Sequence, residues 1–149
     1  MCTENGMKET KYSEGELYTL MYQAEQEGAY VGYVRGWLCA TLDDFYREIS
    51  ASMRFPYYFG WNWAAFDECI TDLDWLKFTS LLIVIDDYDQ LFKKEHPKQA
   101  VKQLLEKYLN KAVEYWTSQN VPITVYLNEQ MEERQKHLFR KTEERVKSK

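Results

Sequence analysis

The chain has 149 residues, a formal net charge of −5, 45% hydrophobic residues and 16% aromatic residues. This length suits one domain with extensions, and the apolar share excludes an intrinsically disordered chain. No signal segment opens the sequence and no apolar run reaches the length of a membrane span, so we expect a soluble cytoplasmic protein. The cysteines Cys2, Cys39 and Cys69 form no CxxC motif, and we interpret them as free thiols in a reducing compartment.

Residues 1–28 predict an N-terminal helical extension. Residues 1–12 are polar, and we expect no regular structure in them. A helix is predicted over residues 13–27, because Ser13 and Glu16 have the spacing of a capping box and apolar residues follow at helical intervals. No residue of this extension suggests a chemical role.

Three segments predict the strands of one sheet: residues 29–36, 80–86 and 121–127. The middle segment, SLLIVID, is a continuous apolar run, which is typical of a parallel strand that is buried on both faces. The sequence therefore predicts a small three-stranded sheet.

Helical patterns occupy the connections between these strands. They run from Thr41 to Met53, over a short segment that begins at Asn62, and from Pro97 to Asn120. Because a helix separates each strand from the next, we expect a parallel sheet with right-handed crossovers and covering helices. The sequence thus predicts an α/β domain over residues 29–128, and residues 129–149 predict a charged C-terminal helix or tail.

Aromatic and acidic residues are concentrated in residues 55–76, FPYYFGWNWAAFDECITDLDWL, which contain no Lys or Arg. Pro56 and Gly60 predict a turn there, and Asn62 is expected to cap the helix that follows. Between residues 67 and 89, Lys77 is the one base among seven acids. Such a patch repels nucleic acid and attracts basic proteins, and the alternative is a surface that serves solubility alone.

The residue spacing in this stretch is similar to a known family. It contains Phe55-Pro56-x-Tyr58-Phe59-Gly60-x-Asn62-Trp63-x-Ala65-Phe66-x-Glu68-Cys69-Ile70, followed by Asp72, Leu73 and Trp75. This pattern resembles the barstar-like family of intracellular ribonuclease inhibitors, over roughly residues 30–128. The resemblance implies a bacterial immunity protein or antitoxin without catalytic residues, metal or cofactor.

The resemblance also implies a partner-binding surface on the aromatic turn, the helix after it and the next loop. The residues of this surface are Tyr58, Gly60, Trp61, Asn62, Ala64, Asp67, Glu68, Asp72 and Leu73. Trp61 is included as an aromatic anchor, and a structural role is the equal alternative for it. Glu68 takes the position that inserts an acid into the phosphate pocket of the nuclease.

Two departures from the family pattern affect the choice of partner. Ala64 stands where the family usually has Asp, and the acid that the family presents on the helix before the last strand falls near Tyr115, beside Glu114. We therefore expect a basic ribonuclease or nuclease toxin other than barnase, and no direct binding of nucleic acid or membrane.

Two further functions remain open from the sequence. A protein-interaction or regulatory module could have kept the fold and lost nuclease inhibition, as Ala64 and the terminal extensions suggest. A magnesium-dependent enzyme could use Asp86, Asp87 and Asp89, which follow a predicted parallel strand. The sequence has no Gly-rich phosphate loop, however, and neither of its histidines lies in a candidate site.

Overall fold

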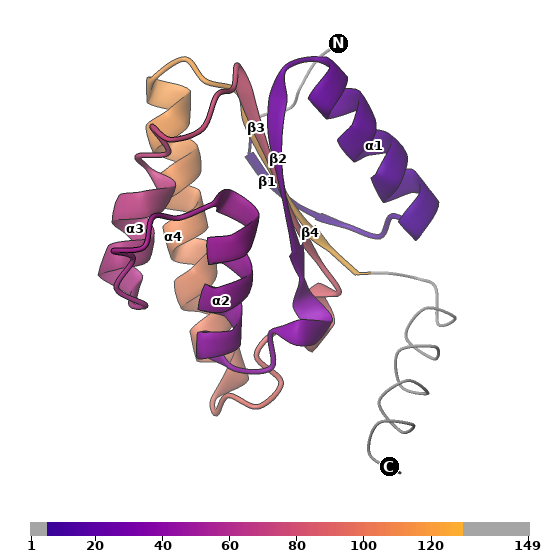
Figure 1. Cartoon of the computed structure of the whole chain (residues 1–149). Helices are drawn as coiled ribbons and strands as arrows, with labels where there is room; N and C mark the ends of the chain where they lie inside the picture. Colours follow the sequence, from indigo (N-terminus) through magenta and orange to yellow (C-terminus); the bar gives the residue numbers. More distant parts are fainter. Residues whose placement is uncertain (1–5, 130–149) are drawn as a thin grey trace, which may run out of the picture.

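The structure, a computed structural model, describes residues 6–129 and consists of one parallel sheet with helices on both faces (Figure 1). The strands are β1 (Gly6–Thr10), β2 (Ala29–Arg35), β3 (Ser80–Asp86) and β4 (Ile123–Asn128), in the spatial order β1-β4-β3-β2. The helices are α1 (Glu14–Gln26), α2 (Leu42–Met53), α3 (Trp63–Ile70) and α4 (Lys98–Ser118), with the short 3-10 segments η1 (Gly36–Leu38) and η2 (Tyr88–Gln90).

The prediction of a three-stranded sheet is wrong by one strand. Residues 6–10, which we expected to lack regular structure, form β1 and pair in parallel with β4, from Gly6 opposite Thr124 to Thr10 opposite Asn128. The segment GMKET is short and has no apolar alternation, so its own sequence gives little strand signal. Its conformation depends on pairing with a strand more than a hundred residues away.

Helix α1 covers the face of the sheet opposite to α2, α3 and α4, as Figure 1 shows. The predicted capping box is confirmed, since the Ser13 side chain accepts from the backbone N–H of Glu16 and the Glu16 side chain accepts from that of Ser13. Leu17 is buried against Leu82 and Val84 of β3. The N-terminal extension thus supplies both an edge strand and the cover of the second sheet face.

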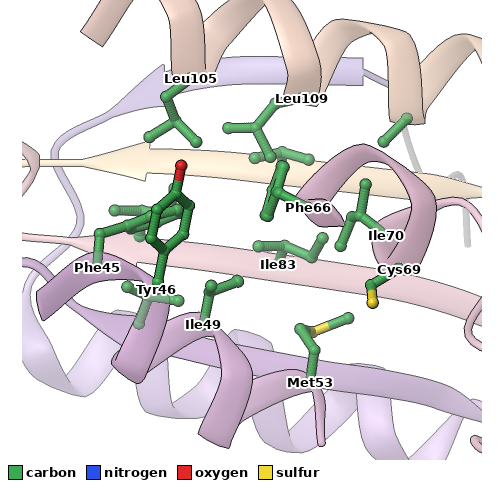
Figure 2. Close-up of a cluster of buried hydrophobic side chains, with 14 of the residues drawn as sticks. Phe45, Tyr46, Ile49, Met53, Phe66, Cys69, Ile70, Ile83, Leu105 and Leu109 are labelled. Carbon is green, nitrogen blue, oxygen red and sulfur yellow. The ribbon is translucent and has the colours of Figure 1, made fainter. Parts of the chain in front are cut away.

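The larger core lies between the sheet and the other three helices (Figure 2). Figure 2 labels its buried side chains from α2, α3, β3 and α4: Phe45, Tyr46, Ile49, Met53, Phe66, Cys69, Ile70, Ile83, Leu105 and Leu109. Alternate residues of β3 point to opposite faces, so Leu82 and Val84 meet α1 while Ile83 and Ile85 enter this core. Burial on both faces explains why SLLIVID carries no polar alternation.

Local signals in the connections also agree with the structure. Thr41 caps α2 with Asp44 as the reciprocal partner, and α2 ends at Arg54, which adopts a left-handed conformation.

Cys39 and Cys69 are free and buried, as expected of thiols, whereas Cys2 and nearly all of the predicted C-terminal helix lie outside the described residues. None of the helices described between residues 6 and 129 combines the length and apolar character needed to cross a membrane.

Candidate partner-binding surface

The aromatic turn between α2 and α3 separates buried rings from exposed ones. Phe55 and Phe59 point inward and pack edge to face, with ring centroids 5.0 Å apart. The turn is closed by a hydrogen bond from the Phe59 N–H to the Pro56 carbonyl at 3.0 Å. Tyr57 and Tyr58 therefore point outward, and they have exposed fractions of 101% and 62%. Exposed aromatic side chains on a fixed turn are suited to anchoring a protein partner.

Trp61 and Asn62 connect this turn to α3. The Ala65 N–H donates to Asn62 Oδ1 at 2.8 Å, and Asn62 Nδ2 donates to the Gly60 carbonyl at 3.0 Å. Asn62 is thus confirmed as the N-cap of α3 and also bonds back to the turn. Trp61 has a positive φ of 50° and is 42% exposed, with the Arg47 guanidinium 5.6 Å from its ring centroid. A bulky residue in this conformation is unusual and presents its ring at the surface.

Helix α3 has a buried side and an exposed side. Phe66, Cys69 and Ile70 enter the core, as the helical spacing predicts. Ala64 and Glu68 are exposed and lie one helical turn apart, so they share the outward side. Glu68 is therefore placed where a partner can reach it.

Asp67, one of the expected contact residues, forms an ion pair with a lysine of α4. Its Oδ2 lies 3.4 Å from Lys111 Nζ on α4, and the two side chains are 31% and 51% exposed. This ion pair offsets the Asp67 charge and leaves Glu68 and Asp72, with Asp74 beside them, as the exposed acids of the region.

Leu73 occupies a different position from the other predicted contact residues. Its side chain is fully buried in the core, and its backbone has a positive φ of 54°. Leu73 therefore offers no exposed surface to a partner in this structure. The apolar stripe of α3 and the following turn accounts for this burial better than the family pattern does.

The acidic field extends to the aromatic turn. Desolvation is the main effect that raises the pKa of the Tyr58 phenol, and the nearby Asp72 carboxylate raises it further. The outward surface around Tyr58, Glu68 and Asp72 thus combines aromatic area with negative charge. Such a surface is suited to binding a cationic protein.

Asp86, the last residue of β3, is held inside the structure by its hydrogen bonds. Asp86 is fully buried and accepts hydrogen bonds from the Tyr33 hydroxyl, from Asn128 Nδ2 and from the Asp87 N–H. Within residues 6–129, no three His, Cys, Asp or Glu side chains come together in a way that could hold a metal ion. The magnesium-dependent alternative that uses Asp86, Asp87 and Asp89 therefore has no support from their geometry.

Three residues that border the outward surface around Tyr58, Glu68 and Asp72 were not identified from the sequence. Lys111 and Tyr108 reach it from α4, and Arg47 reaches it from α2. Tyr108 stacks on Trp63 with ring centroids 5.3 Å apart and an interplanar angle of 5°. Because these contacts join distant segments, no local pattern indicates them.

Comparison with protein families gives a match to most of the chain. A family model described as "Barstar (barnase inhibitor)" matches residues 30–128, which include nearly all of β2 and everything through β4. The match leaves β1 and α1 outside. A search of curated proteins finds no match.

Proposed function

Because the chain belongs to the barstar family, we propose that it inhibits a basic ribonuclease by occupying the phosphate-binding cleft of the nuclease. Barstar is a family of inhibitors, not of enzymes, and the family in general binds a ribonuclease. The observation that supports the proposal best is the exposed position of Glu68 on α3, between the aromatic turn and Asp72.

The proposed mechanism is mimicry of the RNA backbone. A ribonuclease cleft uses Lys, Arg and His side chains to hold phosphates, and the Glu68 carboxylate takes the place of one phosphate there. Asp72 and Asp74 extend the negative field, so encounter is accelerated at low salt and slowed at high salt. Tyr58 and Trp61 supply the exposed aromatic area that holds the docked complex.

Ala64 argues that the partner is a nuclease other than barnase. It lies one turn before Glu68 on the same outward side of α3, where the family pattern usually places a second carboxylate. A methyl group there leaves a cationic group of the partner without its counterion. We propose that the partner presents a less basic surface at this point and that the chain protects its bacterial host as a cytoplasmic immunity protein or antitoxin.

A second candidate function is supported by the same residue. Without a carboxylate at Ala64, the surface could bind a partner that is no nuclease, as an interaction or regulatory module with the barstar fold. This alternative predicts binding that depends on Tyr58 and Trp61 but not on Glu68.

The test is an inhibition assay against a panel of basic ribonucleases that includes barnase. For a nuclease that is inhibited, Glu68→Arg should weaken binding by about 30-fold or more, as expected when a buried charge pair loses one partner. Glu25→Arg is the matched control, because it makes the same charge change at an exposed position of α1 on the other sheet face. Equal inhibition by the two variants would refute phosphate mimicry, and a panel without any inhibited nuclease would favour the interaction module.

A further inference from the structure

We propose that the side of α4 next to α3 is a cationic half of the same surface, and that it selects a nuclease with a carboxylate at the rim of its basic cleft. This cationic ridge comprises Lys107, Tyr108 and Lys111. The inference rests on the proposed function and adds a statement about which partner the site accepts.

The two lysines are held at the border with α3. Lys111 Nζ lies 5.3 Å from the ring centroid of Tyr108, and Lys107 Nζ lies 5.8 Å from the same centroid. The Tyr108 ring itself is fixed by stacking on Trp63 of α3. The phenol ring therefore keeps both ammonium groups beside the predicted docking surface.

One of the two lysines of the ridge forms no ion pair within the described residues. Asp67 pairs with Lys111, whereas no carboxylate among residues 6–129 forms an ion pair with Lys107. Glu114, the exposed acid near the position where the family presents one, comes one helical turn after Lys111 and makes no ion pair within the described part of the chain. A partner that docks on α3 therefore meets an unpaired ammonium group on α4.

Apolar side chains border the lysines along the same side of α4. Leu104 and Tyr115 are each 40% exposed, and the steps from Leu104 to Lys107, Lys111 and Tyr115 are three or four residues. Residues at such steps share one side of a helix. The ridge thus offers apolar contact at both ends and positive charge in the middle, so a partner must match both properties.

The charge pattern determines which partners fit. A uniformly basic nuclease is attracted by Glu68 and Asp72 but repelled by Lys107 and Lys111, and like charges brought together at an interface suppress the wrong partner. A nuclease with a carboxylate opposite the ridge can pair its basic cleft with Glu68 and Asp72 and its carboxylate with the lysines. The ridge therefore discriminates among nucleases that all possess a basic cleft.

The test compares two double variants with barnase as the probe. Lys107→Glu/Lys111→Gln removes the cationic ridge, and Lys93→Glu/Lys94→Gln makes the same net charge change at exposed lysines before α4. We expect the ridge variant to inhibit barnase about tenfold or more better than the control variant, with most of the gain lost at high salt. Thermal unfolding and circular dichroism of both variants verify that the fold is unchanged.

Equal inhibition of barnase by the ridge and control variants, including none by either, would overturn the inference. Where inhibition is measurable, adding Glu68→Arg to each variant distinguishes this failure from failure of the proposed function. If Glu68→Arg abolishes inhibition while the two double variants remain equal, the ridge inference alone is wrong. If the ridge variant gains affinity that Glu68→Arg does not reduce, phosphate mimicry is wrong and the ridge inference stands.

Discussion

Asn128 donates a hydrogen bond from Nδ2 to Asp86 Oδ1 at 3.1 Å, and both side chains are fully buried at the carboxyl ends of β4 and β3. Asn128 Oδ1 accepts from the Thr10 hydroxyl at 2.7 Å and from the Tyr12 N–H at 2.8 Å. One amide side chain therefore joins the edge strand β1 to the two central strands.

Replacing Asn128 with Ala should lower the free energy of unfolding by about 3 kcal/mol, because the buried Asp86 carboxylate loses one of its donors and partly buried groups of Thr10 and Tyr12 lose their hydrogen bonds to the amide. Urea denaturation measures the change. Asn110→Ala is the matched control, since Asn110 is exposed on α4, and it should change stability by less than about 0.5 kcal/mol. A loss at Asn128 no greater than at Asn110 would contradict the role of this amide.

Two glycines predict opposite responses to the same substitution. A Cβ on Gly36 would fall well inside van der Waals contact with the backbone oxygens of Asp86 and Asp87, which cannot move without disturbing the end of β3. Gly36→Ala should therefore destabilise the fold by about 3 kcal/mol or more. Gly15 in α1 has open space around it, so Gly15→Ala should be neutral or stabilise by up to about 1 kcal/mol. Equal changes in melting temperature in the Gly36→Ala and Gly15→Ala variants would show that this packing account is wrong.

The packing of α1 on the second sheet face can be tested at Leu17, which is only 2% exposed. Leu17→Ala should cost about 2–5 kcal/mol of unfolding free energy, because it leaves a cavity between α1 and β3. Leu104→Ala, at a side chain that is 40% exposed, should cost less than about 1 kcal/mol. Similar denaturation midpoints for both variants would mean that α1 contributes little to stability.

The free energy of unfolding should fall at alkaline pH, because buried thiol and phenol groups ionise less readily in the folded chain than in the unfolded chain. Burial is the main cause that raises the pKa of the Cys39 thiol from 9.0 to about 12. The unfolded thiol ionises from about pH 9 while the folded one stays neutral, so this stabilisation is complete below pH 9 and is lost as pH rises toward 12. The loss amounts to at most about 1.4 kcal/mol per pH unit for this group.

Unfolding under reducing conditions at a series of pH values measures this slope. Between pH 9 and 10 the free energy of unfolding of the Cys39→Ala variant should fall less steeply with pH than that of the parent chain. Buried tyrosines such as Tyr46 contribute mainly at higher pH, because their pKa in the unfolded chain is 10.0. A residual slope remains from Cys69, whose pKa burial also raises. Identical slopes in parent and variant would remove Cys39 as the source.

The helices could be predicted because their signals are local. The caps at Ser13, Thr41 and Asn62 each bond to a backbone N–H three residues away, and those pairs are legible in the sequence. The apolar run of β3 likewise predicted a strand that is buried on both faces. Strand β1 was missed because its partners in β4 lie far along the chain and its own residues are polar.

The candidate site could be predicted in part for the same reason. Helical spacing placed Phe66 in the core, where the structure has it, and the exposure of Glu68 agrees with the family pattern. The Asp67–Lys111 pair joins residues 44 positions apart, so no pattern along the chain could reveal it. The resemblance places Leu73 on the partner surface, whereas the structure buries its side chain in the core.

The parallel pairing of β1 with β4 also determines how the molecule bears tension. The chain enters β1 at Gly6, and it leaves β4 at Asn128, at the far end of the same pair of strands. A force that draws the two termini apart therefore loads all the hydrogen bonds between these strands in shear at once, instead of opening them one after another. The pairing of β1 with β4 therefore makes the fold resistant to a force that pulls on its two ends, such as the force applied by a protein-unfolding machine.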